Sequence, residues 1–191
     1  LYHWEVKCGR QTLLRCHYGS PTLPQDVVGR DAFLSNYARL FPEASKAERT
    51  RIWDLFDFLT TLGHGAMLVV AADAQSEAAR LARQGTVVQP VALSEDLLER
   101  VSGIDGTILC DPCGYCHAIG VILDGAASDE CTPSRGSRFN SGIRYVNANK
   151  RRRLAIVVSD DRTVDVYPML RPRISRAELE RGSEQTGVDG H

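Results

Sequence analysis

The sequence has no long apolar segment, no marked excess of charge and none of the short motifs typical of common nucleotide-binding and hydrolytic enzymes. No apolar run approaches the roughly 20 residues that a helix needs to cross a bilayer, and no signal-peptide pattern opens the chain. The net charge of -1 argues against a dedicated nucleic-acid-binding protein, which is usually basic. The P-loop, the dinucleotide fingerprint, Gly-x-Ser-x-Gly and His-Glu-x-x-His are missing as well. We therefore expect a cytoplasmic protein with neither a membrane nor a nucleic acid as partner.

The composition is that of a single folded domain. With 191 residues, of which 43% are hydrophobic, the chain can bury one substantial core. Because the sequence begins at Leu1 and not at Met, we expect that an upstream segment has been removed or left out. The 6 cysteines are expected to be thiols or metal ligands in a reducing cytoplasm, not a disulfide framework.

Apolar spacing predicts helices that alternate with strands. The strongest helical pattern covers residues 45–62, where apolar side chains recur on one face. Further helices are expected at residues 31–40, 76–83, 94–101 and 138–147, and strands at residues 4–8, 12–17, 66–72, 87–91, 107–110, 117–123, 154–158 and 164–167. This mixture predicts an α/β domain with a central mixed β-sheet flanked by helices. The expected divisions are an N-terminal extension at residues 1–45, a nucleotide-binding domain at residues 46–175 and a polar, flexible tail at residues 176–191.

Two short stretches suggest a site for a nucleotide triphosphate. Asp-Gly-Thr at residues 105–107 opens an apolar strand, and Gly-Ser-Arg-Phe-Asn at residues 136–140 leads from a loop into a helix. An acidic residue beside glycine can hold a metal ion. A helix start with Gly, Ser and Arg can bind phosphate through free backbone N–H groups and the helix dipole.

These stretches resemble the diadenylate cyclase domain family, the nucleotide-binding domain of the DNA-integrity scanning protein type. That family carries Asp-Gly-Ala, then Gly-Thr-Arg-His-Arg, then a strand ending in Val-Val-Ser. The matching stretches here are residues 105–107, 136–140 and 157–159, and the resemblance spans residues 53–167. It implies condensation of two ATP molecules into cyclic di-AMP and pyrophosphate by a face-to-face homodimer, with Mg²⁺ or Mn²⁺ as cofactor.

The resemblance also implies roles for the matched residues. Asp105 would bind the divalent metal and activate the 3′-hydroxyl of ATP, as metal-assisted phosphoryl chemistry requires. Gly106 would let the backbone approach the nucleotide. Arg138 would be the second catalytic residue and clamp phosphate charge beside Ser137, which replaces the family's threonine. The remaining expected nucleotide contacts are Thr107, Gly136, Asn140 and Ser159.

Two substitutions leave two functions open. Phe139 stands where the family has histidine, and Asn140 stands where it has a second arginine. Asparagine can donate a hydrogen bond but cannot neutralise phosphate charge, and phenylalanine can do neither. Arg135 and Arg144 lie near enough in sequence to compensate in part. The chain is therefore either a divergent nucleotidyltransferase or a catalytically degraded nucleotide-binding sensor domain of a larger signalling protein.

Asp124-Gly125-Ala126 spells the family triplet literally, but its position does not fit. It lies 14 residues before Arg138, too close for the two strands that the family places between its motifs. It also ends a strand, whereas the functional triplet should begin one. We therefore assign the metal-binding role to Asp105 and expect Asp124 to belong to a turn.

A cysteine cluster and a basic run are the remaining features. Cys110, Cys113 and Cys116 have a spacing compatible with a zinc knuckle, for which His117 or Cys131 would supply a fourth ligand. The alternative, which we prefer to a zinc-stabilised interaction domain, is that these cysteines are ordinary residues of two strands and their turn. The basic run at residues 150–153 is expected to be a solvated connection and not a nucleic-acid patch.

Overall fold

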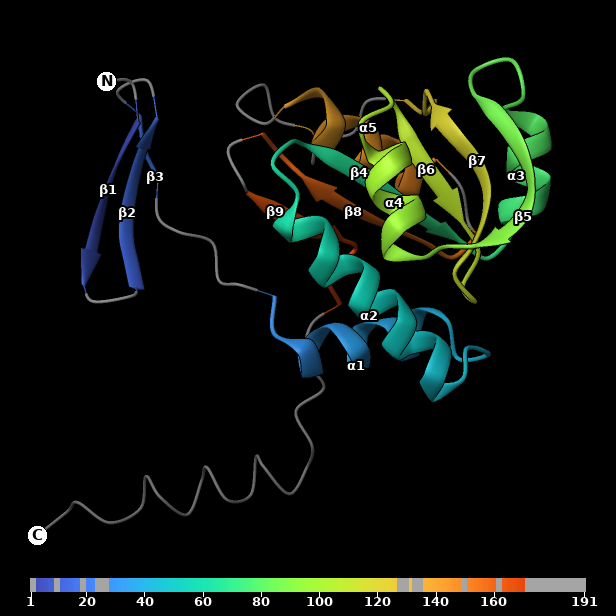
Figure 1. Cartoon of the computed structure of the whole chain (residues 1–191), viewed down its shortest axis with the longest axis horizontal. Coiled ribbons are helices and arrows are strands. Elements are labelled where there is room, and N and C mark those ends of the chain that lie inside the picture. The colour runs from blue at the N-terminus through green and yellow to red at the C-terminus, as the bar shows by residue number, and fades with distance from the viewer. Residues whose placement is uncertain are drawn as a thin grey trace, which may run out of the picture.

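The computed structural model describes residues 3–8, 11–17, 20–22, 28–126, 131, 136–148, 151–160 and 163–170. Its strands and helices follow one another along most of the chain (Figure 1). In chain order they are β1 (His3–Cys8), β2 (Gln11–His17), β3 (Ser20–Thr22), α1 (Arg30–Leu40), α2 (Lys46–Thr61), β4 (Ala66–Ala71), α3 (Ala74–Arg80), β5 (Thr86–Ala92), α4 (Glu95–Ser102), β6 (Thr107–Cys110), β7 (Tyr115–Val121), α5 (Ser137–Asn147), β8 (Arg153–Val158) and β9 (Val164–Tyr167).

The strands form two separate sheets. β1, β2 and β3 make a small antiparallel sheet, and the other strands form a six-stranded sheet in the order β5-β7-β6-β4-β8-β9. Within the larger sheet β4 and β6 run parallel, whereas the other neighbouring pairs are antiparallel. The larger sheet is therefore mixed, as the sequence predicts.

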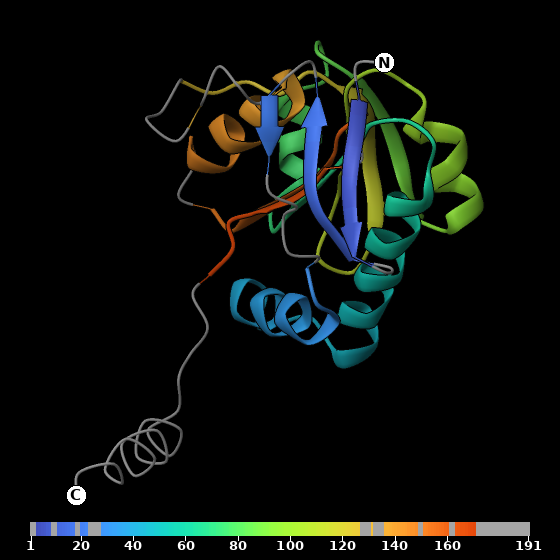
Figure 2. The same ribbon diagram turned by 90° about the vertical axis from the view of Figure 1, so that its left-hand side faces the viewer.

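Helices cover both faces of the six-stranded sheet (Figures 1 and 2). Side chains of α1, α2 and α4 join one core cluster, and side chains of α3 and α5 join the other. Successive residues of β4 alternate between the clusters: Leu68 and Val70 pack towards α2, and Met67 and Val69 pack towards α3 and α5. This explains why β4 reads as a continuous apolar run, since a strand that is covered on both faces has no solvent-facing side. The predicted α/β architecture is confirmed.

The strongest predicted helix is confirmed as α2. Ser45 accepts a hydrogen bond from the N–H of Glu48, and the Glu48 side chain accepts one from the N–H of Ser45, so the helix begins with a capping box. The apolar side of the helix faces the core through four buried side chains, Ile52, Leu55, Phe56 and Leu59. None of the helices in the described ranges is long and apolar enough to cross a membrane.

Helix α1 packs into the main core, although its residues fall in the range expected to form an extension. Phe33 and Tyr37 lie in the same cluster as the apolar side of α2, and the ring of Phe33 stacks on Phe56 with centroids 5.0 Å apart. Asn36 also holds the chain beyond β9, because it donates to Pro168 O and accepts from the N–H of Leu170, both at 2.9 Å. The compact unit therefore begins before residue 46. The expected tail at residues 176–191 lies outside the described residues.

Candidate functional site

Three strand ends meet at one edge of the six-stranded sheet. β4 and β6 are parallel neighbours, so their first residues lie at the same edge. β8 runs antiparallel to β4, and Ala66 at the start of β4 pairs with Val158 at the end of β8. Asp105, Gly65 and Ser159 adjoin these strand ends in the sheet order β6-β4-β8 and therefore lie along one edge.

Arg138 reaches this edge from the first turn of α5. Its Nη1 lies 3.4 Å from both carboxylate oxygens of Asp160, and Asp160 Oδ1 accepts a hydrogen bond from the N–H of Gly65 at 2.7 Å. A Cβ added at Gly65 would come within 2.5 Å of Arg138 Nη1 and 2.6 Å of Asp160 Oδ1. A side chain at position 65 therefore does not fit unless both charged groups move. The structure thus places Arg138 and Asp105 at the same edge, as the motif spacing requires.

The start of α5 holds the other predicted phosphate-binding residues. Gly136 is the N-cap and Ser137 is the first helical residue, and both are exposed. The N-cap glycine has no side chain that could cap the helix, and the positive end of the helix dipole favours an anion at this position. Phe139 and Asn140 follow on the same turn and are half-buried.

Asp105 precedes β6, and its side chain is exposed. Within the described ranges its carboxylate makes no hydrogen bond or ion pair, which leaves both oxygens available. The neighbouring Gly106 has a φ of 112°, and a Cβ there would lie 2.5 Å from the carbonyl carbon of Gly120 in β7. Glycine at position 106 is therefore required by the close approach of two backbones, apart from any contact with a nucleotide.

Two other predicted contacts differ in accessibility. Ser159 is half-buried at the end of β8, and its backbone N–H donates to Thr163 O at 2.9 Å. Thr107 is fully buried in β6, so its hydroxyl faces the protein interior. We therefore keep Ser159 among the candidate contacts and assign no ligand contact to the side chain of Thr107.

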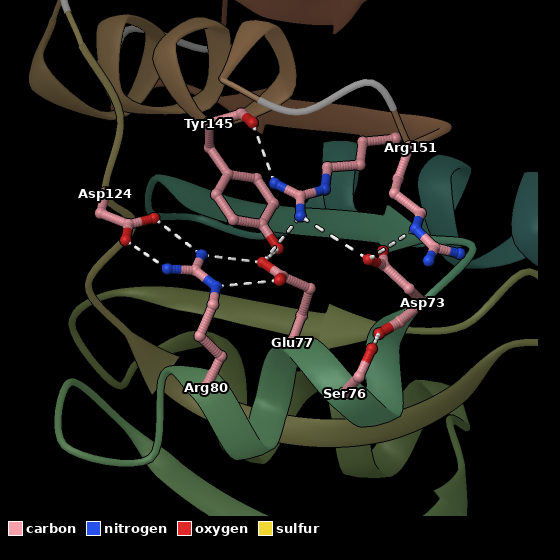
Figure 3. Close-up of polar contacts among 8 residues, drawn as sticks. Asp73, Ser76, Glu77, Arg80, Asp124, Tyr145 and Arg151 are labelled. Carbon is pink, nitrogen blue, oxygen red and sulfur yellow. Dashed lines mark hydrogen bonds and ion pairs between the residues drawn. The ribbon is translucent and has the colours of Figure 1, made fainter.

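Asp124 is engaged in a different set of interactions (Figure 3). Arg80 at the end of α3 donates to both of its carboxylate oxygens, at 2.5 and 2.9 Å, and this pairing lowers the pKa of Asp124 below its usual value. Asp124, expected to belong to a turn, therefore connects the segment after β7 to α3 through its ion pair with Arg80. Both of its oxygens are occupied, in contrast to those of Asp105, which supports the choice between the two triplets.

Arg80, which is itself exposed, also contacts a polar cluster of α3, α5 and β8 whose other members are buried (Figure 3). Glu77 accepts hydrogen bonds from Arg80 and from the hydroxyl of Tyr145, and its Oε2 lies 2.8 Å from Nη2 of Arg153. Arg153 is buried with its guanidinium 4.0 Å from the centroid of the Tyr145 ring. Arg153 is the last residue of the basic run.

The other described arginines of that run are also paired. Arg152 lies 2.6 Å from Glu43, and Arg151 lies 3.8 Å from Asp73. Arg151 and Arg152 are exposed, as the prediction of a solvated connection requires, whereas the buried Arg153 departs from it; Lys150 lies outside the described residues. Acidic partners within the chain already offset its charge, which argues against a nucleic-acid patch.

The predicted cysteine turn is organised by Asp111. One of its oxygens accepts hydrogen bonds from the N–H groups of Cys113 and Tyr115 at 2.9 and 3.0 Å, and the other lies 2.9 Å from Nε2 of His117. His117, a possible zinc ligand, is therefore paired with a carboxylate. A side chain that accepts from the backbone two residues ahead is typical of a turn.

The thiols of this turn lie in surroundings that favour the protonated form. Burial raises the pKa of the Cys110 thiol and raises that of Cys116 to about 11. A hydrogen bond to Glu48, together with burial, raises the pKa of Cys113 to about 11. In the part of the chain that the structure describes, no three His, Cys, Asp or Glu side chains are arranged to hold a metal. This geometry favours the turn interpretation.

Two cavities lie away from the edge that carries Asp105 and Arg138. One, of about 960 Å³, lies between the first half of α2 and the start of α4. The other, of about 520 Å³, lies where β4 and β6 end, and it is lined in part by Asp73, Ser76 and His117. The candidate site is thus defined by converging polar groups at strand and helix ends, not by either cavity.

Two residues of this edge, Gly65 and Asp160, are not among the site residues that the sequence predicts. Their roles depend on contacts between residues that are 95 and 22 positions apart. The one available signal was the position of each beside a predicted strand end.

No protein-family model and no curated protein matches the sequence. Solved structures do match the fold. A crystal structure of a double mutant of DacA from Staphylococcus aureus is 18% identical, with a TM-score of 0.52, over 76% of this chain and 100% of that chain. A hypothetical membrane spanning protein from Bacillus cereus is 19% identical, with a TM-score of 0.54, over 71% of this chain and 66% of that chain. The chain is therefore similar to these proteins in fold.

Proposed function

We propose that the chain is a nucleotidyltransferase of the diadenylate cyclase type, which joins two ATP molecules into cyclic di-AMP and releases pyrophosphate. One observation carries the proposal: Arg138, in the first turn of α5, lies at the sheet edge where the unpaired carboxylate of Asp105 precedes β6. A cation at a helix start and an available carboxylate are what triphosphate binding and metal-assisted transfer require. The likeness in fold to DacA supports the same class of reaction.

The residues of the edge have separate tasks in this proposal. The N–H groups and hydroxyl at Ser137 and the guanidinium of Arg138 bind phosphate oxygens, and Ser159 adds a contact from the end of β8. Asp105 fits a divalent ion, because its carboxylate is exposed and has no partner among the described residues. When bound there, Mg²⁺ or Mn²⁺ would offset phosphate charge and acidify the attacking hydroxyl.

Each chain would hold one ATP, so the reaction needs two chains face to face. The 3′-hydroxyl of one ATP loses its proton to solvent and attacks the α-phosphate of the other, a P–O bond forms, and pyrophosphate leaves with the electron pair of the broken P–O bond. The same step in the opposite direction closes the ring and releases a second pyrophosphate. The protein's contribution is to align two nucleotides that would otherwise meet by chance.

Nucleotide binding is the first test. ATP with Mg²⁺ at millimolar concentration should raise the melting temperature, because a ligand of the native state stabilises it by mass action. Arg138→Ala should remove the shift, whereas Arg100→Ala should retain it, since Arg100 forms an exposed pair with Asp96 on α4. Chromatography after incubation with ATP and Mn²⁺ then shows whether product forms. Absence of any shift in the unmodified protein would overturn the proposal.

A second candidate function is a nucleotide sensor that no longer catalyses the reaction. It is favoured by Phe139 and Asn140 at positions where the resemblance implies a histidine and a second arginine. Loss of one such group from a transition-state clamp costs about 10²–10³ in rate. A protein that binds ATP and Mn²⁺ but yields no product over hours would establish this function instead.

A further inference from the structure

The candidate phosphate site already contains an anion of its own. Asp160 is fixed by the N–H of Gly65 at 2.7 Å and lies 3.4 Å from the guanidinium of Arg138. Asp105 and Asp160 are two carboxylates at the same edge as the Arg138 guanidinium. An incoming phosphate must share Arg138 with Asp160 and approach its carboxylate.

The contact is open enough to be shared. The side chain of Asp160 is 76% exposed and that of Arg138 is 34% exposed, so water and ligand can reach both. Exposed ion pairs of this kind contribute little to stability. The fold is therefore not expected to depend on the ion pair between Arg138 and Asp160. The absence of a side chain at Gly65 leaves space for the guanidinium and the carboxylate.

We propose that Asp160 determines how much negative charge the nucleotide site accepts. In the absence of a metal ion the site favours nucleotides of low charge, such as monophosphates and phosphodiesters, over triphosphates. ATP binds well only as its metal complex. The inference rests on the proposed nucleotide site and adds to it a residue that selects among nucleotides by their negative charge.

The proposal follows from how repulsion depends on ligand charge. AMP, ADP and ATP share one base and ribose, and each step adds a negative charge. Repulsion between like charges several ångströms apart in a water-like dielectric changes affinity on the order of two- to threefold per ligand charge. Removal of the carboxylate charge should therefore help ATP most and AMP least.

Asp160→Asn tests this directly. The amide keeps an oxygen that can accept from Gly65 but removes the charge. Dissociation constants for AMP, ADP and ATP are measured by calorimetry with EDTA present and again with Mg²⁺. Asp96→Asn is the matched control, because Asp96 is 74% exposed and lies 3.3 Å from its own arginine, Arg100, on α4.

Without metal, the unmodified protein should bind AMP more tightly than ATP. At about twofold per ligand charge, Asp160→Asn should strengthen metal-free ATP binding, with about four charges, roughly 16-fold and AMP binding, with about two, roughly fourfold, and the Asp96 variant should change neither. An equal change for all three nucleotides, or weaker binding, overturns the inference even if Mg²⁺-ATP binds the unmodified protein. If that protein binds no nucleotide under either condition, the proposed function and this inference fail together.

Discussion

A single buried carboxylate, Glu77, joins the polar groups of α3, α5 and β8. It is 4% exposed and contacts Arg80, Tyr145 and Arg153 (Figure 3). Burial alone would raise the pKa of Glu77, but the hydrogen bonds from Arg80 and Tyr145 and the charge of Arg153 lower the pKa below its usual value. The ionised form is therefore the one that stabilises the fold.

At the residue scale we predict that Glu77→Gln lowers the free energy of unfolding by about 3 kcal/mol near neutral pH, because the buried Arg153 loses its nearer carboxylate partner, at 2.8 Å, and keeps only Asp73 at 3.9 Å. Since the pKa of Glu77 is lowered, its contribution is present above the pKa of about 4.3 for an unfolded glutamate and is lost as the pH falls through the folded pKa. The two proteins should therefore converge in acid. Urea unfolding measured across this pH range checks both statements. Glu99→Gln, on an exposed position of α4, should change little at any pH.

At the element scale, the approach of β6 to β7 depends on two glycines that face each other. Gly106 has a positive φ, and its missing Cβ would press on the backbone of Gly120, which cannot yield as a flexible side chain could. The start of β6 is also where Asp105 leaves the sheet. The local packing of glycine against glycine thus positions the candidate metal ligand.

Gly106→Ala should lower the free energy of unfolding by about 2 kcal/mol, since it adds both backbone strain and a clash between strands. Gly103→Ala is the matched control three residues earlier. Gly103 has a φ of -76°, and nothing lies within 4 Å of its would-be Cβ, so this change should be neutral or slightly stabilising. Thermal or urea unfolding of both variants measures the contrast. If the Gly106→Ala and Gly103→Ala variants had equal free energies of unfolding, the close approach of β6 and β7 at Gly106 would not contribute to stability.

The elements with a clear apolar period were predictable from the sequence. α2, α4 and α5 were expected within a few residues, because capping residues and one-sided apolar spacing are local signals. The short β3 was missed, since three residues carry no period. The order of strands also could not be predicted, because the parallel pairing of β4 with β6 joins segments about forty residues apart without a local signal.

The same division applies to the candidate site. Asp105 and Arg138 were found from motifs, and the structure places both at one edge. Asp160 was not identified as the partner of Arg138, because that contact exists only once β8 lies beside β4. The burial of Arg153 could not be predicted either, since its counter-charge, Glu77, lies on α3 and a basic run is usually solvated.

At the scale of the whole molecule, the exposed edge must be completed by a second chain if the proposed reaction occurs. Asp105, Gly136 and Ser137 are all exposed there. In the proposed reaction one chain would hold one ATP, and the attacking hydroxyl would belong to the nucleotide of the other. The proposed activity is therefore a property of a pair, and its rate should follow the fraction of chains that are paired.

We accordingly expect specific activity to rise with protein concentration until the dimer saturates, as measured by product chromatography with ATP and Mn²⁺. Asp105→Asn should abolish product while leaving the melting temperature close to that of the unmodified protein, because its carboxylate makes no hydrogen bond or ion pair in the described chain. Asp124→Asn weakens the pair with Arg80 and should cost less than about tenfold in rate, roughly 1.4 kcal/mol of barrier. The reverse order of the two variants would assign the metal to Asp124. The two-chain mechanism would be excluded if the specific activity did not change with protein concentration at concentrations far below the measured dimer dissociation constant.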